Sequence, residues 1–156
     1  MGSDPTSGVM TASTIWTIGY EQATVASVMN ALRDAGVEVL ADVRALPLSR
    51  RPGFSKTTLA ANAREAGIEY VHFKALGTPT EGRAAARRND QSKLERIYEG
   101  QLELPEAIVA GAMLADLAGE KRVALLCYER QAHGCHRTLL RRAMLPDFSV
   151  VDLLPA

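Results

Sequence analysis

The stretch LRDAGVEVL at residues 32–40 decides the fold, because a near copy of it, AREAGIEYV, follows at residues 63–71. Each copy reads as the end of a helix, a glycine that terminates the helix, and a β-strand. The copies start at positions 32 and 63, so they are offset by 31 residues, the size of one helix-plus-strand unit. Because the offset does not continue along the chain, the pattern indicates a parallel α/β sheet and not a solenoid.

Apolar stretches elsewhere in the chain predict the rest of the sheet. We expect strands at 14–20, 37–43, 68–73, 122–128 and 148–154. We expect helices over 24–36 and 56–66, in part of 74–103, from Pro105 to about Gly119, and from His136 to Pro146, with Ser55 capping the second of them. Alternating strands and helices predict an α/β fold: one compact domain with an open, mostly parallel sheet and helices on both faces.

Composition excludes several classes of protein. The 156 residues fit one domain, and 47% hydrophobic with 23% charged residues is typical of a globular chain. Lys+Arg and Asp+Glu both count 18, so global charge favours no polyanionic partner. No apolar run approaches the length of a transmembrane helix, so we expect no membrane partner.

The start of the chain lacks the basic and apolar blocks of a signal peptide. We expect residues 1–13 to be a disordered lead or tag and residues 14–156 to form the domain. With only two cysteines and no export signal, the sequence predicts a reducing, cytoplasmic location.

Candidate binding residues lie at the ends of the predicted strands or just beyond them. They are Gly19 and Tyr20 after the first strand, Asp42, Arg44, Arg50 and Arg51 after the second, and His72 and Gly77 around the end of the third. The carboxyl ends of parallel strands meet at one edge, where ligands of open α/β sheets bind. Arginine forks suit phosphate or carboxylate, so we expect these residues to bind an anionic substrate, with Asp42 holding Arg44 in place.

Two of these features have structural alternatives. A second arginine cluster at 83–88 suits either an anion or a solvated helix face. His72 alternates with Ile68 and Tyr70 along its strand, so it is either a ligand-binding residue or a core histidine with a hydrogen-bond partner.

The segment LLCYERQAHGCHR at residues 125–137 contains both cysteines of the chain. Cys127 ends the predicted central strand, and Cys135 precedes His136 and Arg137 at the start of a helix. Unpaired N–H groups and the helix dipole favour negative charge there, either a thiolate or a bound phosphate.

Four interpretations of this segment stay open at the level of sequence: a disulfide, a metal site, a structural loop, and an anion-binding or thiol-using active site. A metal site would draw on Cys127, His133, Cys135 or His136 with His72, but the spacing matches no zinc motif. We therefore assign no metal and no cofactor.

The active-site interpretation gives each residue a role. Arg44 and Arg137 would clamp the anion, and Glu129 would act as general acid/base or orient His136. Cys135, or Cys127, would be the nucleophile of a covalent reaction. The predicted function is an enzyme acting on a phosphorylated small molecule, a nucleotide or a nucleic-acid fragment. The alternatives are an anion- or nucleic-acid-binding module without turnover and a structural zinc protein, and the oligomeric state is left open.

Four motifs, TIGY (17–20), VLADVRALPLSRRPGFSK (39–56), YVHFKALGTP (70–79) and VALLCYE…CHR (123–137), occur in the same order as in the DUF488 family of small bacterial and archaeal proteins, and the chain resembles that family over nearly all of residues 14–154. Relatives usually carry a histidine where Tyr20 stands. The resemblance implies a compact α/β fold and no established reaction. By the family motif, it implies functional positions at Gly19, Asp42, Arg44, Pro47, Phe54, Leu76, Gly77, Pro79, Glu129, Cys135, His136 and Arg137.

A weaker likeness links EVLADVR (38–44) and VALLCYE (123–129) to strands of rhodanese-like enzymes. The segment between Cys127 and Arg137 is longer than the anion-binding loop of those enzymes. This likeness therefore concerns the fold alone.

Overall fold

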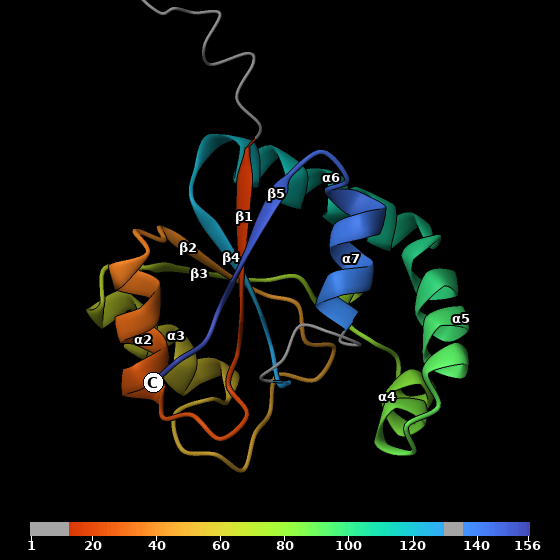
Figure 1. The fold of residues 1–156 in the computed structure, drawn as a ribbon, viewed down its shortest axis with the longest axis horizontal. Helices are drawn as coiled ribbons and strands as arrows, with labels where there is room; N and C mark the ends of the chain where they lie inside the picture. Colours follow the sequence, from red (N-terminus) through yellow and green to blue (C-terminus); the bar gives the residue numbers. More distant parts are fainter. Residues whose placement is uncertain (1–12, 130–135) are drawn as a thin grey trace, which may run out of the picture.

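The five strands form one sheet in which all neighbouring strands run parallel (Figure 1). The computed structural model describes residues 13–129 and 136–156. The strands are β1 (Thr14–Gly19), β2 (Val39–Asp42), β3 (Glu69–His72), β4 (Val123–Cys127) and β5 (Ser149–Leu153). Their order across the sheet is β3-β2-β4-β1-β5, so the strand predicted to be central, β4, lies in the middle.

Helices cover both faces of the sheet, as the sequence predicts. They are α2 (Val25–Asp34), α3 (Lys56–Glu65), the short 3-10 helix η1 (Lys74–Leu76), α4 (Thr80–Arg87), α5 (Gln91–Leu102), α6 (Pro105–Glu120) and α7 (His136–Met144). One face packs against α2 and α3, and the opposite face packs against α6 and α7 (Figure 1). The described residues therefore form a single α/β domain.

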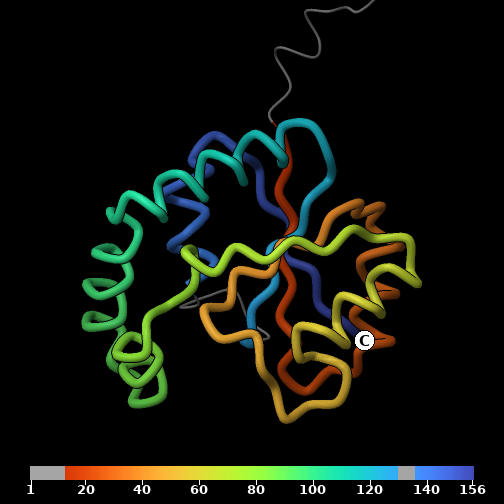
Figure 2. The backbone as a smooth tube through the Cα atoms, turned by 180° about the vertical axis from the view of Figure 1, so that it is seen from behind, coloured from red at the N-terminus to blue at the C-terminus, as the bar shows by residue number. Residues whose placement is uncertain are grey.

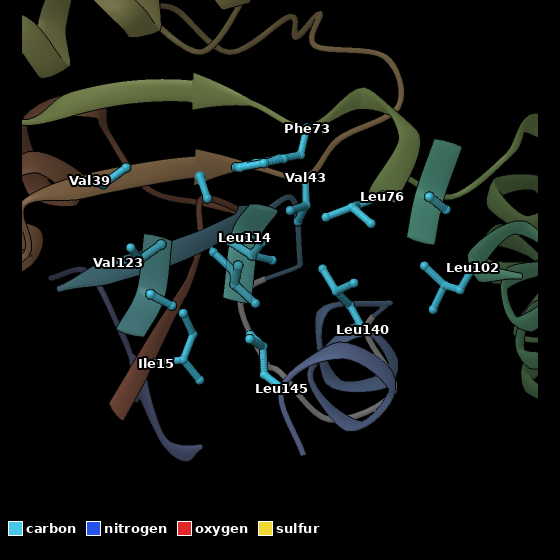
Figure 3. Close-up of a cluster of buried hydrophobic side chains, with 14 of the residues drawn as sticks. Ile15, Val39, Val43, Phe73, Leu76, Leu102, Leu114, Val123, Leu140 and Leu145 are labelled. Atoms are coloured by element: carbon cyan, nitrogen blue, oxygen red, sulfur yellow. The ribbon is translucent and has the colours of Figure 1, made fainter. Parts of the chain in front are cut away.

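The alternation of side chains along β4 builds two separate hydrophobic cores. Val123 and Leu125 belong to the core under α6 and α7, whereas Ala124 and Leu126 belong to the core under α2 and α3. All four are fully buried, which is why the strand reads as a continuous apolar run. Figure 3 shows the first core, with Leu140 of α7 among the side chains contributed by the strands.

Local chemistry accounts for several helix starts. Thr24 and Ser27 form a capping box at the start of α2, with each side chain accepting the other residue's backbone N–H. Pro105 occupies the first turn of α6, as expected. Ser55 stands at the N-cap of α3 but forms no capping bond, because its Oγ accepts the Ser49 N–H at 3.0 Å instead.

Within the segment between β3 and β4, the two helices α4 and α5 form an arm, here called the α4–α5 arm. Side chains of α5 attach the arm to η1: the Tyr98 hydroxyl donates to the Leu76 carbonyl at 2.5 Å, and the Gln101 amide donates to the Ala75 carbonyl at 2.9 Å. In Figure 2 the yellow-green chain after β3 leads away from the sheet to this arm. The arm contacts α7 and η1, so it stands beside the sheet as a wall.

The connections leave neighbouring strands on opposite faces of the sheet. The chain leaves β1 and β2 through α2 and α3, but it leaves β4, which lies between those strands, through α7. This reversal opens a crevice at the carboxyl ends of β1, β2 and β4, where doubly wound folds bind their ligands.

Within the described ranges, we find no helix that combines the length and the apolar character needed to cross a membrane. The predicted lead at residues 1–13 lies outside the described residues, apart from Ser13.

A substitution at Gly77 tests how tightly η1 packs against the loop after β2. A Cβ atom added at Gly77 would lie 2.0 Å from the Ala45 amide nitrogen, and Gly77 has φ −85°, so lack of space and not conformation requires glycine. We expect Gly77→Ala to lower the free energy of unfolding by about 2–3 kcal/mol in urea titrations.

The matched control is Gly100→Ala in α5, where an added Cβ meets nothing within 4 Å. Alanine is the better helix former by about 1 kcal/mol, so this change should leave stability unchanged or raise it. Equal stabilities for the two variants would contradict the packing described here.

Candidate functional site

A buried ion pair closes the carboxyl end of β2. Asp42 is fully buried and Arg44 is 6% exposed. Arg44 Nε donates to Asp42 Oδ1 and Arg44 Nη2 donates to Asp42 Oδ2, both at 2.8 Å. The two residues therefore form a bidentate fork, and Asp42 holds Arg44 as the sequence suggested.

Three aromatic residues complete the surroundings of this pair. Arg44 Nη1 donates to the Tyr20 hydroxyl at 3.2 Å and to the Phe54 carbonyl at 2.7 Å, and the rings of Tyr20 and Phe54 stack with centroids 4.4 Å apart. The Tyr70 hydroxyl donates to Asp42 Oδ2 at 2.5 Å. Four of the five guanidinium N–H groups of Arg44 thus have protein acceptors, which fixes the side chain.

Burial and charge act together on the titration of this group. Burial alone would lower the pKa of the Arg44 guanidinium. The hydrogen bonds and charge of Asp42 outweigh burial and raise that pKa above its ordinary value. Burial, followed by the hydrogen bond to Asp42, raises the pKa of the Tyr70 phenol. Both groups are therefore held in their protonated forms.

Three more residues that the sequence assigned to substrate binding support this end of the sheet. His72 Nε2 donates to the Arg44 carbonyl at 2.8 Å, which gives one ring nitrogen a protein partner. Gly77 packs against the backbone of Ala45. Gly19 ends β1 in register with Cys127 of β4.

The remaining predicted arginines lie in different places. Arg51 donates to the Ala23 carbonyl and ties its loop to the segment before α2. Arg50 is exposed and does not line the cleft described below. Arg137, in the first turn of α7, is fully buried, so neither Arg137 nor Arg44 presents an exposed guanidinium.

A cleft of about 1050 Å³ lies between this edge of the sheet and the α4–α5 arm. Its floor holds Tyr20, Arg44, Tyr128 and Glu129, and α7 contributes His136, Thr138, Leu139 and Arg142. The arm contributes Arg83, Ala86, Arg87, Leu94 and Glu95. Most of its surface is apolar or aromatic, and its polar groups come from several elements, as is usual for small-molecule sites.

Three potential metal ligands or catalytic groups meet at the inner end of the cleft. The Cys127 Sγ, a Glu129 carboxylate oxygen and a His136 ring nitrogen all lie within 4.8 Å of one another. Glu129 and His136 are half-buried and line the cleft, whereas Cys127 is fully buried behind them. Cys135, the other predicted nucleophile, lies outside the described residues.

The orientation of His136 is set by the backbone of β2. His136 Nε2 lies 3.1 Å from the Val43 carbonyl oxygen, which can only accept, so Nε2 carries a proton, and in the neutral ring Nδ1 holds the lone pair. The Tyr98 ring packs edge-on against the His136 ring with centroids 5.5 Å apart. The imidazole is therefore held on two sides.

Comparison with known proteins adds a family to this geometry. The sequence model described as domain of unknown function DUF488 matches residues 24–144, which is most of the chain. The chain belongs to the DUF488 family. Neither the curated proteins nor the solved structures gave a match to it.

Sequence reasoning missed part of the site of this DUF488 protein. Arg83 and Arg87 belong to the 83–88 cluster that the sequence left open between an anion site and a solvated helix face, and the structure places both on the cleft. Arg142 belongs to the basic stretch that opens the last helix in the sequence, and the structure places it on the same cleft. The sequence did not indicate that Tyr70 and Tyr98 would donate to Asp42 and Leu76.

The ion pair of this DUF488 protein predicts a large stability effect. Asp42→Asn removes the one carboxylate that pairs with the buried Arg44 among the described residues, so we expect a loss of about 3–5 kcal/mol in the free energy of unfolding. The control is Glu69→Gln, which breaks the exposed Lys121–Glu69 pair at 3.4 Å. That loss should stay below about 1 kcal/mol, and similar losses in both variants would contradict the buried network.

The raised pKa of Tyr70 predicts that the free energy of unfolding falls at alkaline pH, whereas a carboxylate with a lowered pKa would make it fall at acidic pH. Because the folded state raises the pKa of the Tyr70 phenol, the folded chain keeps a proton that the unfolded chain loses above about pH 10. Stability from this phenol is complete below that pH and lost as the pH rises. Urea unfolding should show a steeper alkaline decline for wild type than for Tyr70→Phe, and parallel curves would refute the assignment.

Proposed function

We propose that this DUF488 protein is an enzyme that binds a small anionic substrate in the cleft and acts on it at the inner end, beside Glu129 and His136. The observation that carries the proposal is the set of three arginines on the cleft wall, from two facing elements, whose charges no carboxylate neutralises among the described residues. The cytoplasmic location stays a prediction.

The three arginines are Arg83 and Arg87 of α4 and Arg142 of α7. The ion pairs within the described part of the chain are Asp42–Arg44 and Glu69–Lys121, so none of the three arginines has an acidic partner there. Arg83 donates to the Thr78 carbonyl, while Arg87 and Arg142 are exposed. Guanidinium groups in this state favour phosphate or carboxylate ligands.

This assignment moves the anion-binding role away from the pair that the sequence suggested. Arg44 already gives four N–H groups to protein acceptors, and Arg137 is fully buried. We propose that Arg44 supports the floor of the cleft, and that Arg87 and Arg142 meet the charged part of the substrate.

The cleft favours a small molecule over a long nucleic acid. Glu21 and Glu95 also line it, so its surface alternates in charge instead of forming a continuous positive track. A polyanion needs such a track, whereas a phosphorylated small molecule with hydrogen-bond donors matches alternating charges. Leu46, Leu48 and Leu139 provide apolar contact for the remainder of the ligand.

The inner end of the cleft supports turnover instead of binding alone. A carboxylate and an oriented imidazole lie where three strands end, which is where α/β enzymes place their chemistry. Cys127 is fully buried and does not line the cleft, so we propose no covalent step on its thiol. The binding module of the sequence analysis remains the alternative.

Anion binding is tested with the double variant Arg87→Gln/Arg142→Gln. Calorimetric titration with inorganic pyrophosphate and with a nucleoside triphosphate at low salt should show binding to wild type. A charge-assisted hydrogen bond contributes about 1.5–3 kcal/mol, so losing two should weaken binding by about 100-fold or more.

The control is Arg64→Gln, an exposed arginine on α3 across the sheet from the cleft wall, which should bind as wild type does. Absence of binding to wild type, or equal losses in the two variants, would refute the anion site. Glu129→Gln separates the alternatives: lost turnover of phosphate esters with retained pyrophosphate affinity supports an enzyme, and no turnover by wild type supports a binding module.

A further inference from the structure

We propose that Cys127, Glu129 and His136 form a zinc site that opens into the cleft. Thiolate, carboxylate and imidazole are the three ligand types that zinc uses in proteins, and here each comes from a different part of the β4–α7 connection. Among the described residues, this is the one group of three Cys, His, Asp or Glu side chains whose ligand atoms lie close enough together to share a metal ion.

The spacing of the ligand atoms is close to that of a tetrahedral zinc site. Zinc binds sulfur at about 2.3 Å and nitrogen or oxygen at about 2.0–2.2 Å, which places neighbouring ligand atoms about 3.3–3.6 Å apart. The three atoms here lie within 4.8 Å of one another, so a shift of about 1 Å brings them into range. The half-buried Glu129 side chain would have to move, because Cys127 is held in the central strand.

The hydrogen bond to Val43 prepares His136 for a metal. Histidine ligands of metals almost always donate their other ring N–H to a carbonyl or carboxylate, which fixes the tautomer. His136 donates from Nε2 to the Val43 carbonyl, so the proposal assigns Nδ1 to zinc. Val43 itself is anchored, because its N–H donates to the Leu126 carbonyl of β4 at 3.4 Å.

The position of the cluster distinguishes an open site from a closed structural one. Glu129 and His136 line the cleft, and Cys127 closes the site from behind. Among the described residues, three ligands come from one side of the site, so the fourth position of zinc would face the cleft, which is the pattern of catalytic zinc. The two anionic ligands neutralise the ion's charge, which lowers the cost of holding it in a half-buried place.

The use of the ion rests on the proposed function, whereas its binding does not. A zinc ion at the fourth position would polarise a substrate oxygen or hold a water close to the anion that Arg87 and Arg142 bind. Zinc binding is measured without any substrate, so the two proposals fail separately.

Metal uptake is tested on the full chain, stripped with a chelator and then titrated with zinc against a chelating dye. Wild type should bind one zinc ion per chain. Cys127→Ser, Glu129→Gln and His136→Asn should each lose more affinity than the roughly 10–100-fold that an outer partner of a metal ligand contributes. Glu95→Gln, a carboxylate of the same cleft outside the cluster, is the control and should bind as wild type does.

A second measurement identifies the sulfur and does not depend on affinity. In a Cys135→Ser background Cys127 is the only thiol, because the chain has two cysteines. Cobalt(II) added to this variant should give a thiolate-to-metal charge-transfer band that disappears when Cys127 is also changed to serine. A cobalt spectrum without that band would overturn the assignment.

Other outcomes also decide the matter. No zinc uptake by wild type, or uptake that Cys127→Ser and Glu129→Gln leave unchanged, overturns the site. If the chelator unfolds the chain, the ion is structural and the open-site assignment is wrong. In either case the pyrophosphate titration of the arginine variants still reports on the proposed function.

Discussion

The buried ion pair between Asp42 and Arg44 is the constraint on which the rest of this site depends. Burying two charges costs several kcal/mol per ion, so the pair is tolerated only where hydrogen bonds satisfy both groups. Here both carboxylate oxygens and four guanidinium N–H groups have partners, drawn from Tyr20, Phe54 and Tyr70. The pair therefore links three segments: the end of β1 through Tyr20, strand β3 through Tyr70, and the loop after β2 through Phe54.

The consequence of this constraint appears on the other face of the sheet. Val43 lies between Asp42 and Arg44 in the chain, so fixing its neighbours fixes the direction of its carbonyl group. That carbonyl accepts the Nε2 proton of His136, which sets the face of the imidazole toward Cys127 and Glu129. A buried ion pair on one side of β2 thus orients a histidine of the cleft on the other, while the α4–α5 arm lines the opposite side of the cleft.

Sequence reasoning captured the features that short-range patterns control. The repeated helix–glycine–strand unit and the apolar run Val123–Cys127 predicted a parallel sheet with β4 at its centre, because a strand buried on both faces must be apolar throughout. Pro105 marked the start of α6. The cysteine, glutamate and histidine of the inner cleft were among the candidates, since all follow the same strand.

Tertiary contacts decided what the sequence could not. A buried arginine and an exposed one look the same in sequence; the contacts of Arg44 with Tyr20 and Phe54, 24 and 10 positions away, are seen only in the structure. Likewise, Arg142 reaches the cleft because α7 packs beside α5, a contact between segments with no shared local pattern. Ser55 had the right residue type for a helix cap, but its Oγ accepts the Ser49 N–H and no N–H of α3.

The most direct test of this account is the proton position on His136, read from the ring nitrogen shifts in long-range proton–nitrogen spectra before and after addition of zinc. The account predicts the neutral form with the proton on Nε2, and a shift of Nδ1 alone when the ion binds. A proton on Nδ1, or spectra that zinc leaves unchanged, would contradict both the orientation imposed by Val43 and the site built on it.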